Sequence, residues 1–395
     1  MTLLHSPILA TPEKIDLTLG FLPLMDCAPL VIAKEKGFFS DVGLNVQLSR
    51  EGSWASIRDK VMLGLLDGAQ MLAGIPLAST LGLGSPQVPM VTAFSIGLNG
   101  NAITLSHALL AEIDELGHDP EDTSANGLKQ LIQLRKANGR AKITLAMVYT
   151  YSAHSYLLRY WLSAAGIDPD NDINLTVVPP PQMAVTMKKG LIDGYCAGEP
   201  WNSVAQEMGI GSPVISGYQI WNNCPDKVFA VLESWHNAHP ATHEALICAL
   251  IQASNWLDQP QNSDEALDIL LANAYLGPAL SMLPQPVLNQ GNRLFFRYAA
   301  SYPWRSHALW FLEQMQHCNQ LQDNTDLHQL ACQVYRPDLY RAVASKMQLP
   351  HPTIDFKPEG FHDREWVLQG AAGAVTMGSD LFFNGGTFEP RRQPC

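Results

Sequence analysis

The sequence predicts an α/β protein built from two units that follow each other along the chain. In the first hundred residues, segments typical of strands alternate with segments typical of helices, an order expected for a parallel sheet covered by helices. The same order returns between residues 143 and 198. Both units contain a helix that ends in glycine, a polar turn and an alternating strand: "KGFFSDVGLNVQLS" and "AAGIDPDNDINLTVV". Two such units indicate two lobes with a ligand cleft between them.

The first unit is expected to alternate three strands with two helices. Pro29 stands near the start of the first helix, a position that proline favours. Ser53 is expected to cap the second helix, in which Ile57, Val61 and Leu65 recur every four residues and predict a buried face. The expected strands are residues 15–21, 44–49 and 68–74, and the expected helices are residues 29–39 and 54–66.

The second unit repeats this pattern, and a mainly helical region follows it. Its expected strands are residues 143–148, 174–179 and 192–198, and its expected helices are residues 154–166 and 182–191. Further helices are expected at residues 126–139 and 240–257, and the glycine-rich residues 370–390 are expected to form an irregular wrap.

We therefore expect three segments. Residues 15–100 form the first part of lobe I, residues 101–224 form lobe II, and residues 225–395 complete lobe I with a helical region and the C-terminal wrap. A chain of 395 residues is long enough for two or more compact units.

The charge balance narrows the class of partner. Lys and Arg number 25 and Asp and Glu number 37, which gives a net charge of −12. Because phosphate backbones are bound by clustered Lys and Arg, we expect no direct nucleic-acid partner. We also expect no membrane partner, because no apolar run approaches the length of a membrane span. An anionic ligand would therefore need a local, shielded site.

The N-terminus and the cysteines predict a cytosolic protein. "MTLLHSPILATPEK" lacks the basic segment and long apolar run of a secretory signal, and Cys27 lacks the small residue expected before a lipid-modified cysteine. The seven cysteines form no C-x-x-C pair and are odd in number, which favours reduced, mostly buried thiols over disulfides. They are residues 27, 196, 224, 248, 318, 332 and 395.

Four junctions between strands and helices carry candidate binding residues. Trp54 and His154 stand at helix starts, where free N–H groups and a partial positive charge favour anions. Asn101 lies between a glycine-containing turn and a strand. Lys227 lies two residues before the apolar run at 229–232, where the chain enters a buried strand, which suggests a counter-charge for a small anion.

The four side chains can all donate hydrogen bonds. Nitrate and nitrite only accept hydrogen bonds, whereas bicarbonate also carries an O–H group that needs an acceptor such as a carboxylate. An unpaired polar group costs about 1–3 kcal/mol, so a site of donors with one cation favours nitrate or nitrite.

Ordinary structural roles are also open for these residues. A tryptophan at a helix start is more often packed in the core, a single histidine is usually hydrogen-bonded within the fold, and Lys227 could form a surface ion pair. The chain contains no phosphate-binding loop, no G-x-S-x-G and no H-E-x-x-H, so we expect no enzyme activity, no cofactor and no metal site.

Five strings are distinctive in combination: "GFLPLMDCAPLVIAKEKGFF", "SWASIRDKV", "VVPPPQMAVTMKKGLIDGYCAGEPWN", "HPATHEAL" and "ASYPWRSHALWFL". They resemble the nitrate and bicarbonate substrate-binding family of bacterial ABC uptake systems. The resemblance runs from about residue 15 to "FFNGGTFEP", and "VVPPPQM" with "GEPWN" are its most specific strings. It implies a type II periplasmic-binding-protein fold whose two lobes close over an oxyanion.

The resemblance also implies a set of ligand-binding residues. Trp54 matches the tryptophan of an S-W-x-x-x-R-D motif, and His154 matches a histidine that opens a helix before L-R-Y-W. Lys227 matches a lysine in P-x-K-x-F, where bicarbonate-binding members carry an acid, which points to nitrate or nitrite. Asn101 stands in "NGNAI" where members show a glutamine in D-G-Q-A-I, so the pocket is expected to be reshaped.

The absence of an export signal makes the chain similar to one kind of family member, the cytosolic nitrate/nitrite sensor of the nitrate-assimilation antitermination pair. That resemblance implies a partner, an RNA-binding antiterminator response regulator that is released when nitrate or nitrite binds. Two alternatives remain open at this stage. One is the substrate-binding component of an ABC nitrate uptake system, and the other is an enzyme similar to thiamine-pyrimidine synthases, which use an active-site histidine and a cysteine-rich motif.

Overall fold

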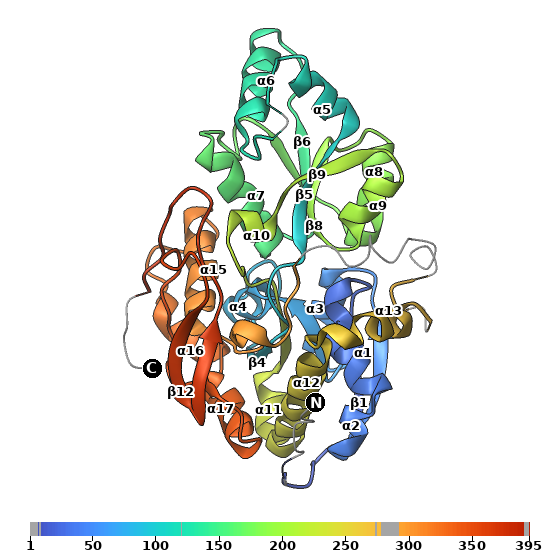
Figure 1. Cartoon of the computed structure of the whole chain (residues 1–395), viewed down its shortest axis with the longest axis vertical. Helices are drawn as coiled ribbons and strands as arrows, with labels where there is room; N and C mark the ends of the chain where they lie inside the picture. Colours follow the sequence, from blue (N-terminus) through green and yellow to red (C-terminus); the bar gives the residue numbers. More distant parts are fainter. Residues whose placement is uncertain (1–6, 8, 120, 273–274, 278–291, 391–394) are drawn as a thin grey trace.

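The computed structural model describes residues 7, 9–119, 121–272, 275–277, 292–390 and 395. Its frame is a pair of five-stranded sheets with helices packed around them (Figure 1). The first sheet has the order β2-β1-β3-β10-β4. Its strands are β1 (Asp16–Phe21), β2 (Asn45–Arg50), β3 (Gly68–Leu72), β4 (Met90–Ser95) and β10 (Lys227–Leu232).

The second sheet has the order β7-β6-β8-β5-β9 and lies above the first in Figure 1. The strands of the first sheet come from the two segments predicted for lobe I, and those of the second sheet come from the segment predicted for lobe II. The division of the chain into these lobes stays a prediction. The strands are β5 (Asn101–Ser106), β6 (Thr144–Met147), β7 (Asn174–Val177), β8 (Gly194–Gly198) and β9 (Gly211–Ser216).

Both sheets are mixed, although the sequence pattern predicted parallel sheets. Three strands of each sheet pair in parallel, β2, β1 and β3 in the first and β7, β6 and β8 in the second. One strand in each sheet follows a segment of chain that arrives from the other sheet. This strand is β10 in the first sheet and β5 in the second, and each runs antiparallel to both of its neighbours. The βαβ pattern predicts the parallel strands only, because it says nothing of a strand that arrives from the other sheet.

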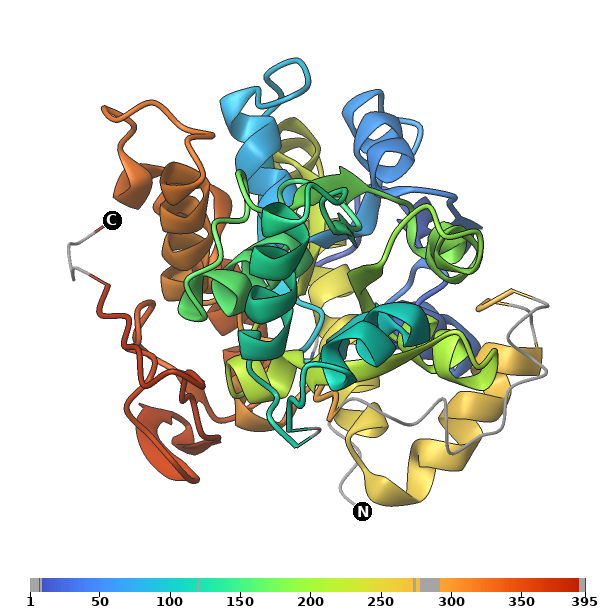
Figure 2. The ribbon, with the colours of Figure 1, turned by 90° about the horizontal axis from the view of Figure 1, so that it is seen from above.

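Helices cover the strands and extend from them on both sides of the frame (Figures 1 and 2). The helices of the first hundred residues are α1 (Ala28–Glu35), α2 (Phe38–Asp41), α3 (Trp54–Met62) and α4 (Gly74–Leu81). The following helices are α5 (His107–Asp114), α6 (Asn126–Ala137), α7 (Ala153–Ala164), α8 (Met183–Lys188), α9 (Trp201–Glu207) and α10 (Gly217–Ile220). The later helices are α11 (Glu233–Ala238), α12 (Pro240–Leu257), α13 (Ser263–Ala272), α15 (Arg305–His317), α16 (Leu327–Val334) and α17 (Pro337–Lys346).

Helix α3 shows where the sequence pattern succeeds and where it fails. The predicted cap is confirmed, because the Ser53 hydroxyl accepts a hydrogen bond from the Ser56 N–H at 3.1 Å. The helix ends at Met62, however, and Leu65 is 64% exposed instead of buried. Gly64 has a φ of 69°, the left-handed conformation that ends many helices at glycine.

Three strand regions were missed, and one of them is β9. Strand β4 is buried on both faces, so its sequence "MVTAFS" has no alternation to indicate a strand. The predicted irregular wrap begins instead with an antiparallel hairpin of β12 (Trp366–Ala371) and β13 (Gly373–Met377), joined by β11 (His351–Pro352). The hairpin turns at Ala372 and Gly373, whose φ values are 58° and 136°, and alanine gives no sequence signal for such a turn.

The cysteines are only partly as expected. Four are buried free thiols, which agrees with the prediction, and Cys318 is a half-buried thiol. Cys332 and Cys395 form a disulfide, which contradicts the prediction of reduced cysteines. The spacing argument missed this pair because its members lie 63 residues apart and meet only through the fold. The buried thiols are Cys27, Cys196, Cys224 and Cys248.

Among the described residues, no helix is long and apolar enough to cross a membrane. The prediction of a cytosolic location depends on the N-terminal stretch, and residues 1–6 and 8 lie outside the described residues.

The start of α12 is capped by a side chain from far away in the sequence. The Glu13 carboxylate accepts hydrogen bonds from the N–H groups of Ala241 and Thr242 at 2.9 and 2.8 Å. Partial burial opposes ionisation, but these hydrogen bonds outweigh it and lower the pKa of Glu13 to about 2. The carboxylate is also favoured by the positive end of the helix.

We expect Glu13→Ala to lower the free energy of unfolding at neutral pH by about 0.5–1 kcal/mol, a small effect because the side chain is exposed. Because the folded-state pKa lies below the ordinary value of 4.5, this stabilisation is present above about pH 4.5 and is lost as the pH falls toward about 2. Urea unfolding of both proteins at pH 7 and pH 3 measures it. An equal difference at both pH values would contradict this account.

Candidate functional site

The chain passes between the two sheets twice, and each passage ends at a predicted binding residue. The first passage leads from β4 to Asn101, the first residue of β5. The second leads from β9 to Lys227, the first residue of β10. The two passages lie side by side, because the Asn99 N–H donates a hydrogen bond to the Cys224 carbonyl at 2.9 Å. The return of the chain therefore brings Asn101 and Lys227 to the same region.

The other two predicted residues stand at helix starts. Trp54 is the first residue of α3, directly after its cap Ser53. His154 is the second residue of α7, whose cap Ser152 accepts a hydrogen bond from the Ser155 N–H at 3.1 Å. The caps fix where each helix begins, and Trp54 and His154 are both buried.

Lys227 is the centre of the cluster. Its Nζ atom lies 2.7 Å from an Asp26 carboxylate oxygen, is hydrogen-bonded to Asp226, and lies 6.0 Å from the centroid of the Trp54 ring. Burial alone would lower the pKa of Lys227, but the two carboxylates outweigh burial and raise it. An ammonium group has three N–H donors, so two are used by the carboxylates and one is left for a ligand.

Asp26 is held by a second layer of hydrogen bonds. The Gln70 side-chain N–H donates a hydrogen bond to the Asp26 carboxylate. The side-chain oxygen of Gln70, Oε1, accepts a hydrogen bond from the Leu22 N–H at 2.9 Å. Burial raises the pKa of Asp26 more than Lys227 lowers it. Asp26 comes from the short turn of 3₁₀ helix Met25–Cys27, which follows β1 in the sequence.

His154 lies against the other carboxylate. Its Nδ1 atom is 3.6 Å from the Asp226 Oδ1 atom, too far for a good hydrogen bond. Burial and the nearby Lys227 ammonium lower the pKa of His154 well below its ordinary value, so the ring is neutral and offers one donor and one acceptor. Burial raises the pKa of Asp226, and Lys227 offsets only part of that rise.

Asn101 completes the group from the second sheet. Its amide lies near enough to the Asp226 carboxyl group to oppose the rise of that pKa, although the geometry falls short of a hydrogen bond. The amide lies directly against Gly217, where an added Cβ would come within 1.8 Å of the Asn101 oxygen. Only glycine at position 217 leaves room for this side chain. The four predicted residues are therefore brought together around Lys227 and Asp226.

Several polar atoms in this cluster are buried and have no hydrogen-bond partner within the described part of the chain. Buried polar atoms are normally paired, and each unpaired one costs about 1–3 kcal/mol. A group of them around one ammonium is expected where a small polar ligand binds. The atoms are Trp54 Nε1, both amide atoms of Asn101, both ring nitrogens of His154 and Asp226 Oδ1.

Sequence reasoning missed the carboxylates, and this changes the chemistry of the site. Asp26 and Asp226 lie within the cluster, so the site is not made only of donors with one free cation. Burial of a lysine demands a partner carboxylate, and this requirement could have indicated Asp226 beside Lys227. The site can therefore accept a hydrogen bond as well as donate several.

A second pair of opposite charges lies next to the cluster. Glu199, from the "GEPW" string, accepts hydrogen bonds from the Ser203 N–H and hydroxyl at 3.2 and 2.9 Å. Arg293 interacts electrostatically with Glu199 and with Asp26, and its burial lowers its own pKa. Arg293 packs on Gly100, whose φ of 92° and missing side chain allow the approach. No sequence signal marked Arg293.

The buried cysteines near the site give little support to an enzyme. Asp226 and Cys224 are near enough to Cys196 to raise its pKa, so two thiols that are distant in the sequence lie in the region of the cluster. Burial raises the pKa of Cys196 well above its ordinary value and acts in the same direction on Cys224. A thiol that stays protonated is a poor nucleophile, and both are best explained as packing residues.

Comparisons with known proteins agree with the fold and give the family. The nitrate import ATP-binding protein NrtC of Synechocystis sp. is 42% identical over 356 residues, which cover 86% of this chain and 51% of that protein. The chain thus spans about half the length of the curated relatives that it matches first. The nitrate/nitrite binding protein NrtA of Nostoc sp. is 31% identical over 404 residues and covers 97% of this chain and 86% of that protein.

A solved structure supports the same fold over nearly the whole chain. The crystal structure of the periplasmic nitrate-binding protein NrtA from Synechocystis has a TM-score of 0.82 and 27% identity, covering 96% of this chain and 97% of that one. The predicted periplasmic-binding-protein-like α/β fold is therefore confirmed. Residues 10–271 match the model of the NMT1-like family, and the chain belongs to that family.

Proposed function

We propose that this protein binds nitrate or nitrite and acts as the substrate-binding component of an ABC nitrate uptake system. The observation that carries the proposal is the group of unpaired polar atoms around Lys227. The Lys227 ammonium, the Trp54 indole, the Asn101 amide and the His154 ring each offer an N–H group to a small planar oxyanion. Homology to NrtA, which is described as a nitrate/nitrite binding protein, supports this ligand class.

Bicarbonate is the competing ligand, and Asp226 is the reason to consider it. The Asp226 Oδ1 atom is a buried acceptor without a partner among the described residues, and bicarbonate carries the O–H group that could fill it. Nitrate and nitrite would leave this oxygen unpaired unless Asp226 carries a proton. Protonated Asp226 would then donate to the anion, which fits the raised pKa of this carboxyl group.

Calorimetric titration of the full chain with nitrate, nitrite and bicarbonate tests the proposal. We expect binding of nitrate or nitrite at one site, with Trp54→Phe weakening it about tenfold because the indole N–H is lost. Trp221→Phe is a matched control, since Trp221 is also a buried indole with an unpaired Nε1 but stacks on Phe382. Equal losses in both variants, or no binding of any of the three anions, would refute the proposal.

A cytosolic sensor is a second candidate, favoured by one observation. The identity to the ATP-binding protein NrtC is higher than that to NrtA, 42% against 31%. A chain that works together with an ATP-binding protein on the ATP-hydrolysing side of a membrane would work in the cytosol. The predicted antiterminator partner has no counterpart in the names of these relatives, and it stays a prediction of the resemblance.

Fractionation of native cells separates the two roles. A substrate-binding component of an importer is expected outside the cytoplasmic membrane, whereas a sensor is expected in the cytosol. For a sensor, pull-down of the antiterminator should succeed without nitrate and fail with it. Association that ignores nitrate would count against that partner.

A further inference from the structure

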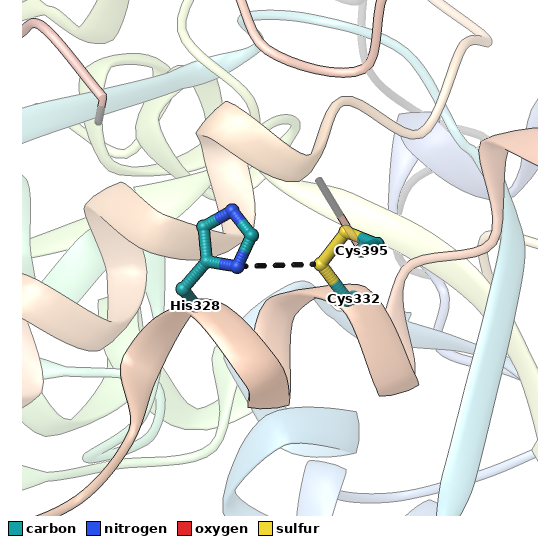
Figure 3. A group of neighbouring side chains, drawn as sticks. All are labelled: His328, Cys332 and Cys395. Carbon is teal, nitrogen blue, oxygen red and sulfur yellow. Dashed lines mark hydrogen bonds between the residues drawn. A yellow bond between two sulfur atoms is a disulfide. The ribbon is translucent and has the colours of Figure 1, made fainter. Parts of the chain in front are cut away.

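A second cluster of chemistry-bearing side chains lies on α16, far along the chain from Lys227. His328 and Cys332 are four residues apart and share one face of the helix, and Cys395 lies against Cys332 (Figure 3). In Figure 1 the C-terminus lies beside α16 at the outer edge of the molecule. Ligand atoms of these three residues all lie within 4.8 Å of one another.

We propose that His328, Cys332 and Cys395 bind a thiophilic divalent cation, with Zn²⁺ as the reference ion, when the two cysteines are reduced. Thiolate sulfur and imidazole nitrogen are the ligands that zinc prefers. Three protein ligands leave a fourth position for water, as in open zinc sites. The absence of a metal site was expected from the absence of known metal-binding motifs, and the spacing of Cys395, 63 residues after Cys332, gives no sequence signal for this site.

The geometry of the helix pair fits zinc. The distance from Cys332 Sγ to His328 Nδ1 is 3.7 Å. In a tetrahedral site with bonds of about 2.3 Å to sulfur and about 2.0 Å to nitrogen, that edge measures about 3.5 Å. The Phe356 ring stacks on the imidazole at 5.1 Å between centroids and holds its plane. The backbone places these two ligands without rearrangement.

The third ligand needs only a small movement. Sulfur atoms of a disulfide lie about 2 Å apart, whereas two thiolates on one zinc ion lie about 3.8 Å apart. The Cα atoms of Cys332 and Cys395 are 5.7 Å apart. At this distance, rotation of the two side chains can place the sulfur atoms either in a disulfide or on one zinc ion. Two thiolates, a neutral imidazole and Zn²⁺ sum to zero charge, so the filled site carries no uncompensated charge.

The disulfide and the metal site exclude each other. Hydrogen peroxide, a two-electron oxidant, takes one electron pair from the two thiols, so that the S–S bond forms and two molecules of water are released for each peroxide consumed. Reduction by a phosphine and water reverses this, because the phosphine becomes its oxide and both sulfurs regain protons. The cation binds as these thiols lose their protons, so the pair acts as a redox-controlled metal site.

Metal titration of the full chain, free of added histidines, tests the proposal. One sample keeps the disulfide; the other is reduced with a phosphine and kept under inert gas. We expect the reduced protein to take one equivalent of Zn²⁺ from a coloured chelator and the oxidised protein to take none. Co²⁺ should give the reduced protein a thiolate-to-metal charge-transfer absorption.

Variants show whether these three side chains are the ligands. Cys395→Ser changes an exposed side chain, and it should weaken zinc binding at least tenfold, as should His328→Ala. Cys318→Ser is the control for the same cysteine-to-serine change, because Cys318 is a half-buried free thiol that lies outside the cluster. This variant should bind zinc as the unaltered protein does. Failure of the reduced protein to bind zinc, or unchanged affinity in Cys395→Ser or His328→Ala, would overturn the proposal.

Discussion

Lys227→Met is expected to abolish nitrate binding and to destabilise the fold by about 3–5 kcal/mol. The side chain is buried between Asp26 and Asp226, so its loss removes the ammonium group that pairs with both of these buried carboxylates. The proposed anion would also lose the ammonium group expected to contact it, which costs about 2 kcal/mol or more of binding free energy. Thermal unfolding and calorimetric titration measure the two effects.

A double variant separates the two effects. Asp226→Asn combined with Lys227→Met removes one charge of each sign and should recover part of the lost stability, while nitrate binding stays absent. If the double variant recovered both stability and binding, Lys227 would be a structural counter-ion only. If Lys227→Met left the melting temperature unchanged, the buried ion pairs would not exist in solution.

The second large effect is a dependence of nitrate affinity on pH. One of the two carboxyl groups beside Lys227 is expected to take up a proton when nitrate binds. Above the pKa of that group, nitrate affinity should fall by up to tenfold for each pH unit. Two carboxyl groups already face Lys227, so a bound anion adds repulsion that protonation relieves. Burial raises the pKa of Asp26 and of Asp226, and a neighbouring anion would raise both further. Binding therefore takes up a proton and is favoured at lower pH.

The other groups near the two carboxylates either strengthen this pH dependence of nitrate affinity or leave its direction unchanged. A bound anion would favour protonation of His154, which is also an uptake of a proton. Arg293 stands next to Asp26 as a permanent cation, and Asn101 does not titrate. Binding should therefore be accompanied by a net uptake of protons that is greater than zero for each anion bound.

Calorimetry in two buffers with different enthalpies of ionisation counts these protons. Asp226→Asn is the informative variant, because a neutral amide replaces the carboxyl group that can donate only when protonated. It should bind nitrate with a flatter pH profile and lose any affinity for bicarbonate. Nitrate affinity that does not change with pH, with no proton uptake, would contradict this part of the account.

Much of the framework was predictable from local patterns. The apolar repeat of residues 240–257 gave α12 with its observed bounds, and Ser53 gave the start of α3. These features depend on neighbours in the sequence, which is why they can be predicted from it. The direction of β10 and the turn at Ala372 depend on contacts with distant residues or on an unusual backbone conformation, and no local pattern indicates them.

The candidate site shows the same division. Trp54, Asn101, His154 and Lys227 were proposed because each stands at a junction between elements, and the fold brings them close together; their role in binding stays a prediction. Asp26 was missed because "LMDCAPL" reads as an ordinary turn into a helix, and its role exists only once β10 delivers Lys227 beside it. Sequence reasoning can thus propose donors at junctions, but the balance of charge among them requires the fold.

A crystal structure of the protein grown with nitrate tests the central claim most directly. The account predicts one planar anion beside Lys227, with its oxygen atoms within hydrogen-bond distance of Lys227 Nζ and of the indole, amide and imidazole nitrogens that are now unpaired. Water molecules satisfying these nitrogens, with no anion beside Lys227 at saturating nitrate, would contradict it.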